Sequence, residues 1–176
     1  MKKMIALILM LALLSTAAFA ETVLPELDLQ KYEFDVSEDT VIAGSGEPAS
    51  EDTRTNKAGI TRHFLNYDVQ FQNLKWNLSY LFVDSQLKDV SAELDPEQVD
   101  PSLDPTELYN QACGLMNEIL EKPSSVEGPT KIKEGDYKGA SQYLSTYSKG
   151  KLTGYVNMIA KDNEILLLQI GYYPAE

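Results

Sequence analysis

The chain has 176 residues, enough for one domain, and its 43% hydrophobic and 24% charged residues are typical of soluble proteins. Its single cysteine excludes an internal disulfide, and its single histidine excludes a His-cluster metal site. The formal net charge of −12 argues against binding to polyanionic DNA or RNA, which depends on Lys and Arg. The composition therefore indicates an acidic globular domain without a nucleic-acid partner.

The first twenty residues have the pattern of a cleavable signal peptide. Two lysines precede an apolar run over 5–14, and the small residues that follow end in the sequence AFA at 18–20. Such an A-x-A site predicts cleavage between Ala20 and Glu21. The run is shorter than the ~20 residues of a membrane span. We expect an exported bacterial protein, secreted or periplasmic, with no transmembrane segment after cleavage; an uncleaved anchor helix is the alternative.

After the expected cleavage site we expect an N-terminal arm over 21–31 and then a single domain over 32–176. Apolar and polar residues alternate over 32–37, which is the period of a half-buried strand. The short apolar run 40–42 can pair with this strand. The stretch 43–59 holds glycines, a proline and mixed charges without apolar periodicity, which predicts a long surface loop.

The β pattern dominates from residue 60 to residue 83. Apolar and polar residues alternate on both sides of Gln72 and Asn73, which predicts two antiparallel strands joined by a turn. The next stretch, 84–104, is acidic and interrupted by prolines. Apolar residues at positions 87, 90 and 94 have helical spacing, which predicts a short helix over 87–94.

One strong amphipathic helix is predicted over about 106–122. Asp104 is a natural N-cap, Pro105 suits the first helical position, and Glu107 completes a capping box. Pro123 ends the pattern. The residues that form its apolar stripe are Leu108, Ala112, Leu115, Met116, Ile119 and Leu120.

The C-terminal quarter returns to β structure. We expect strands over 131–140, 143–147, 152–160 and 165–173, the last two joined as a hairpin. The beginning of the last strand, 165–168, is apolar on both faces, which favours a central position in the sheet. Strands, a helical crossover and then a meander predict an α+β fold, in which one main amphipathic helix packs on an antiparallel β-sheet.

The C-terminal half resembles the PsbP/Mog1-type sandwich in its pattern. The resemblance covers about two thirds of the chain after the signal peptide and rests on the capped helix and on Ile132, Gly139-Ala140, Tyr143, Gly154-Tyr155 and Gly171-Tyr172-Tyr173. A cystatin-like wrap of one helix on a sheet is the alternative. Members of these families are mostly accessory or binding proteins, so the resemblance implies a binding role and supplies no catalytic residues.

Tyrosines are the first candidates for a ligand-binding surface. Tyr143 and Tyr147 share one face of a predicted strand, and Tyr155 lies on the next strand. A tyrosine combines a flat apolar ring with a polar tip, which suits contact with glycans, peptides or other proteins. Cross-strand packing is the alternative role for the same residues.

The acidic stretch 84–107 is the candidate site for chemistry. Closely spaced carboxylates suit calcium, and Asp95 and Asp100 are the candidate ligands, although the EF-hand order is missing. No other cofactor is expected. We predict a non-enzymatic binding or accessory domain at the cell envelope or outside the cell, with a protein or a small-molecule or glycan ligand. A secreted hydrolase with its acidic site in 84–107, or a calcium-binding envelope protein, is the alternative.

Overall fold

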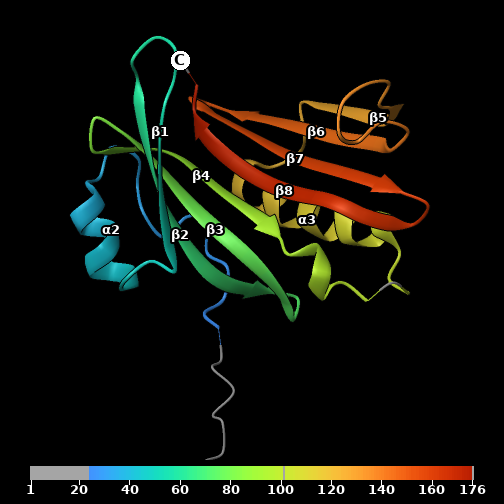
Figure 1. Cartoon of the computed structure of the whole chain (residues 1–176), viewed down its shortest axis with the longest axis horizontal. Coiled ribbons are helices and arrows are strands. Elements are labelled where there is room, and N and C mark those ends of the chain that lie inside the picture. The colour runs from blue at the N-terminus through green and yellow to red at the C-terminus, as the bar shows by residue number, and fades with distance from the viewer. Residues whose placement is uncertain (1–23, 101, 176) are drawn as a thin grey trace, which may run out of the picture.

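The computed structural model describes residues 24–100 and 102–175. The predicted signal peptide, with Ala20 and Glu21, lies outside these residues. All eight strands form one antiparallel sheet in the order β1-β2-β3-β4-β8-β7-β6-β5 (Figure 1). The strands are β1 (Ser50–Thr55), β2 (Thr61–Phe71), β3 (Leu74–Val83), β4 (Gln86–Leu94), β5 (Ser125–Lys131), β6 (Ser141–Lys149), β7 (Leu152–Lys161) and β8 (Glu164–Pro174). The helices are α2 (Glu38–Ser45), the short 3-10 helix η1 (Pro96–Gln98) and α3 (Pro105–Leu120). The predicted α+β class with an antiparallel sheet is confirmed.

The order of elements repeats along the chain, although the sequence shows no repeat. Helix α2 precedes the meander β1–β4, and helix α3 precedes the meander β5–β8. The last strands of the two meanders, β4 and β8, pair in the middle of the sheet. The strand that contains the apolar run 165–168 is therefore central, as predicted, although β4 pairs with residues 169–172 of β8 and not with the run itself.

One face of the sheet carries the hydrophobic core. Helix α3 covers the part of this face formed by β6, β7 and β8, and the segment 24–45 covers the part formed by β2, β3 and β4 (Figure 1). In that segment the Tyr32 ring lies 5.5 Å from the Tyr80 ring, and the Phe34 ring lies 5.1 Å from the Tyr172 ring.

Helix α3 begins as its capping residues predict and packs closely on the sheet. The Asp104 carboxylate accepts a hydrogen bond from the Thr106 backbone N–H at 2.8 Å, which caps the helix. Gly154 of β7 lies under the helix, and a Cβ there would lie 2.6 Å from Met116 Cε. The absence of a side chain at Gly154 thus allows the helix to approach β7.

The N-terminal part departs from its prediction. Residues 32–37 form no strand and contain a turn at Phe34 and Asp35; their alternating side chains are half-buried because the backbone runs across the core face. The run 40–42 lies in α2, whose N-cap Ser37 accepts a hydrogen bond from the Thr40 backbone N–H. The stretch 43–59 contains the end of α2 and β1. An edge strand with little burial has no apolar periodicity, which is why the sequence pattern missed β1.

Two further predicted elements are wrong. The expected helix over 87–94 is strand β4, because the turn at Asp84 and Ser85, both at positive φ, folds the chain back onto β3. The expected strand over 131–140 is largely a loop, and β5 lies earlier, at Ser125–Lys131. The hairpins β2–β3 and β7–β8 and helix α3 are confirmed.

Candidate functional site

The other face of the sheet, which we call the open face, carries no helix among the described residues, and the part formed by β2, β3 and β4 is mainly polar. Directly paired residues on antiparallel strands share a face, so the strand register defines rows of side chains across the sheet. One row consists of Asn66, Ser79, Ser91, Gly171 and Tyr155. The next row consists of Asp68, Asn77, Glu93, Gln169 and Asn157.

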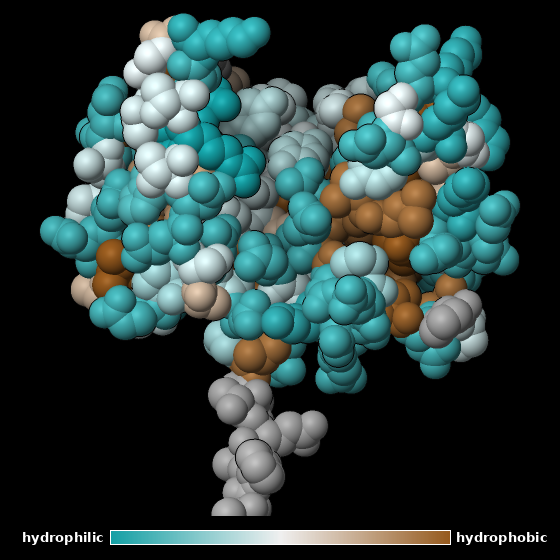
Figure 2. Space-filling model, viewed as in Figure 1, coloured by the Kyte–Doolittle hydropathy of each residue, from teal (hydrophilic) through white to brown (hydrophobic). Residues whose placement is uncertain are grey.

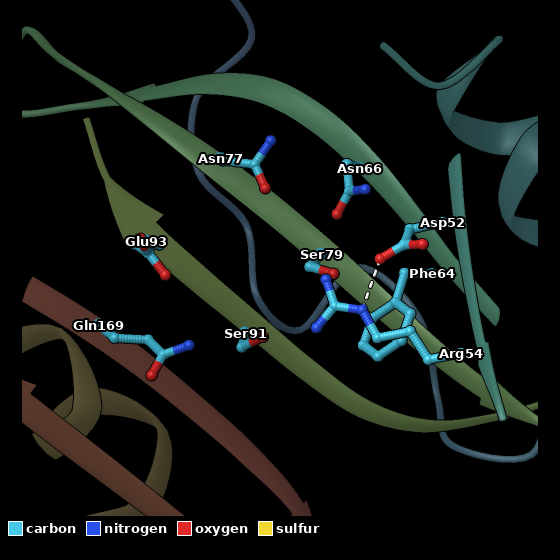
Figure 3. A pocket seen from close by; sticks show the side chains of 9 residues that line it. All are labelled: Asp52, Arg54, Phe64, Asn66, Asn77, Ser79, Ser91, Glu93 and Gln169. Atoms are coloured by element: carbon cyan, nitrogen blue, oxygen red, sulfur yellow. Dashed lines mark hydrogen bonds and ion pairs between the residues drawn. The ribbon is translucent and has the colours of Figure 1, made fainter. Parts of the chain in front are cut away.

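Two depressions adjoin on the open face. The first has a volume of about 220 Å³ and lies between Phe64 at one end and Glu93 and Gln169 at the other (Figure 3). The second has a volume of about 360 Å³ and reaches Pro96. Both are lined by Asn77 and Glu93. We call the two together the groove; Figure 2 shows that the molecule is hollowed between its two halves.

Arginine and aspartate close one end of the groove. The Arg54 guanidinium lies 5.0 Å from the centre of the Phe64 ring and forms an ion pair with Asp52, as the dashed line in Figure 3 marks. Stacking on the ring and pairing with the carboxylate both orient the guanidinium. The positive charge at this end is therefore already balanced within β1.

Tyr155 reaches across β8 because residue 171 is a glycine. A Cβ at Gly171 would lie 2.8 Å from Tyr155 Oη and 3.0 Å from Ser91 Cβ. The Tyr155 ring thus fills the space above Gly171, and its hydroxyl lies beside β4. Burial raises the pKa of this hydroxyl well above its ordinary value of 10.0, and the nearby Asp89 carboxylate raises it further.

Two carboxyl groups of β4 carry perturbed pKa values. Burial raises the pKa of Asp89 from 3.8 to about 6, and hydrogen bonding to Ser91 opposes this only in part. Burial also raises the pKa of Glu93. Among residues 24–100 and 102–175, neither carboxylate forms an ion pair. Both groups are therefore partly desolvated without a compensating positive charge.

The three predicted tyrosines do not share one face of the sheet: two lie on the core face and one lies on the open face. Tyr143 and Tyr147 share one face, as expected, but it is the core face under α3. Tyr147 is 1% exposed and donates a hydrogen bond to the Cys113 carbonyl at 3.4 Å, and the Tyr143 ring lies 5.7 Å from the Tyr109 ring. Only Tyr155 lies on the open face, at the candidate site.

The two predicted calcium ligands have local structural roles. Asp95 accepts a hydrogen bond from the Glu97 backbone N–H at 3.1 Å and caps η1. Asp100 accepts one from the Ser102 backbone N–H at 2.8 Å, and this bond lowers the pKa of Asp100. No group of three or more potential metal ligands comes together in the part of the chain that the structure describes.

The candidate acidic stretch 84–107 contained Asp89 and Glu93, but sequence reasoning singled out Asp95 and Asp100 instead and treated the segment 87–94 as a short helix. A signal was nevertheless present: Asp89, Ser91 and Glu93 alternate with Val90, Ala92 and Leu94. This is the period of a strand with one polar and one apolar face. The segregation of carboxylates to the open face follows from that alternation.

A scan against protein-family models and searches of curated proteins and of solved structures found no match to this chain. None of the described helices is long and apolar enough to cross a membrane.

Proposed function

We propose that this chain is an exported binding protein that holds its ligand on the open face of the sheet. Export is proposed from the signal-peptide pattern of residues 1–20. The binding role is proposed from the open face, as the sequence resemblance to PsbP/Mog1-type accessory proteins also suggests. Membership of that sandwich fold remains a prediction.

The observation that carries the proposal is the groove: it is lined by amides, hydroxyls and Glu93, which has no cation partner among the described residues, and the half-buried Asp89 lies on the same face. A buried carboxylate without a cation destabilises the folded state, because its charge has lost hydration without gaining a partner. Carboxylates with perturbed pKa values are frequent at functional sites, where a bound ligand can supply the missing positive charge or hydrogen-bond donor. Asp89 is half-buried without a cation among the described residues, and burial also raises the pKa of Glu93, which lies in the groove among amides and hydroxyls.

An apolar area flanks the groove on the same face. Ile159 pairs directly with Leu167, and Leu144 lies on the neighbouring strand β6 with its side chain on this face. Figure 2 shows an apolar area over the half of the molecule that contains β7 and β8. Binding surfaces typically combine apolar contact area with a few placed polar groups.

The test is the melting temperature of the purified protein against calcium, neutral oligosaccharides, peptidoglycan fragments and peptides. A ligand at one hundred times its Kd should add about 2.7 kcal/mol of stability. For a domain of this size, that corresponds to a rise of about 5–10 °C. A ligand that binds the open face should give this rise with the wild-type protein.

A matched pair of variants locates the site. Asn77→Trp fills the groove, whereas Asn117→Trp places the same side chain on the exposed surface of α3. We expect the ligand-induced rise to vanish in Asn77→Trp and to persist in Asn117→Trp. A rise that survives in Asn77→Trp would place the binding site elsewhere and contradict the proposal.

A secreted hydrolase is the second candidate, and the raised pKa of Asp89 favours it. A carboxyl group that titrates at about 6 can act as a general acid near neutral pH. The wild-type protein and Asp89→Asn would be assayed on a panel of glycoside and ester substrates. Activity that the wild type has and Asp89→Asn lacks would replace the binding role with catalysis.

A further inference from the structure

We infer that the ligand of the open face is an extended peptide segment of a partner protein, with a Lys or Arg side chain opposite Glu93. The inference rests on the proposed binding function and adds the chemistry of the partner. It follows from the charge of the groove and its hydrogen-bonding groups.

The groove is an open depression on the sheet rather than a closed pocket. Its lining side chains come from β1, β2, β3, β4 and β8, so it crosses the strands of the sheet. The first depression, of about 220 Å³, is smaller than typical small-molecule sites of about 300–1,000 Å³, and the second, of about 360 Å³, is near the lower end of that range.

Charge favours a basic partner. The cations of the groove are already paired: Arg54 with Asp52, and Lys75 with Asp68 at 3.0 Å. Glu93 lines both depressions between these pairs and has no cation among the described residues. Asp89 lies next to Ser91 on the same strand and face, also without a cation in that part of the chain. Glu93 is therefore a negative charge in the groove without a partner among the described residues, and Asp89 adds a second negative charge on the same face; a guanidinium or ammonium group would neutralise Glu93.

The polar groups of the groove suit a peptide backbone. Asn66, Asn77 and Gln169 each carry an amide with both donors and acceptors, and Ser79 adds a hydroxyl. A peptide backbone likewise offers one donor and one acceptor at each residue. The partner's apolar side chains would then meet the apolar area beside the groove.

The experiment is selection from a display library of random dodecapeptides on the purified wild-type protein, followed by affinity measurement. We expect the selected peptides to carry Lys or Arg at a fixed position. Their affinity should fall about ten-fold or more in the Asp89→Asn/Glu93→Gln double variant, and by a similar factor when citrulline replaces the conserved arginine. The charge-matched control is Glu134→Gln/Asp136→Asn, in the exposed loop between β5 and β6, which should bind with unchanged affinity.

Each other outcome is decisive. Selected peptides without a basic residue, or peptides that bind both double variants equally, would overturn the inference. If such peptides lose binding to Asn77→Trp, the open face is still the binding surface and only the basic partner is wrong. Peptides that bind Asn77→Trp as tightly as the wild type would contradict the proposed function as well. A library that yields no binder would overturn the peptide partner, and the oligosaccharide panel would then decide the binding role.

Discussion

Asp89→Asn should stabilise the protein at neutral pH and have little effect in acid. In the folded protein the pKa of Asp89 is about 6, compared with the ordinary value of 3.8 expected in the unfolded chain. Between these two pH values the folded state binds more protons than the unfolded state. The free energy of unfolding therefore falls as the pH rises through this window, and it stays reduced above pH 6. Asparagine has no proton to lose, so the variant avoids this decrease.

The size of the effect follows from the two pKa values. A pKa difference of about two corresponds to about 3 kcal/mol, which is an upper limit because Asp89 is only half-buried and water still screens its charge. We therefore expect Asp89→Asn to raise the free energy of unfolding by about 1–2 kcal/mol at pH 7.5. For a chain of this length, this corresponds to a rise in melting temperature of about 2–8 °C.

Urea unfolding at pH 7.5, 6 and 4 measures the effect directly. The stability difference between Asp89→Asn and wild type should shrink as the pH falls and nearly vanish at pH 4. Asp84→Asn, in the exposed β3–β4 turn, is the control and should change stability by less than about 0.5 kcal/mol. A stabilisation that is equal at all three pH values, or a destabilisation at pH 7.5, would refute the conclusion that desolvation raises this pKa.

Three more predictions test the packing and capping, and urea unfolding measures each. Gly154→Ala places a methyl group 2.6 Å from Met116 Cε and should lower the free energy of unfolding by about 1–3 kcal/mol. The control Gly114→Ala in α3 meets no atom within 4 Å and should raise the free energy of unfolding by up to about 1 kcal/mol. Equal effects of the two substitutions would contradict the close approach of α3 to β7. Asp104→Ala removes the N-cap of α3 and should cost about 1 kcal/mol, which Asn at this position should restore. Tyr147→Ser should cost about 3–5 kcal/mol, because the side chain is 1% exposed; wild-type stability would contradict its place in the core.

Local signals were sufficient for part of this structure. Asp104, Pro105 and the apolar stripe predicted α3 to within two residues at its end, because capping and helical periodicity act within a few residues of sequence. The hairpin turns at Gln72-Asn73 and at Asp162-Asn163 were predicted for the same reason: their residues adopt the positive φ that tight turns need. The antiparallel α+β class followed from these elements.

Local signals gave the wrong secondary structure where the same spacing of apolar residues is compatible with two structures. Residues 32–37 alternate in burial like a strand, but they gain that burial by lying across the sheet. Positions 87, 90 and 94 fit a helix, but the turn at Asp84 pairs them with β3. In both cases the secondary structure is set by contacts with other strands of the sheet, which the local sequence pattern does not contain.

The sequence by itself determined the acidic composition, helix α3, the hairpins and the antiparallel class, because each depends on neighbouring residues. Only the tertiary structure decided which face of the sheet stays open. It placed Tyr147 under α3 and Tyr155 beside Asp89, although both tyrosines belong to similar alternating strands. The candidate site therefore became visible only when β4 paired with β8, since this pairing joins the two meanders and brings their polar rows into one groove.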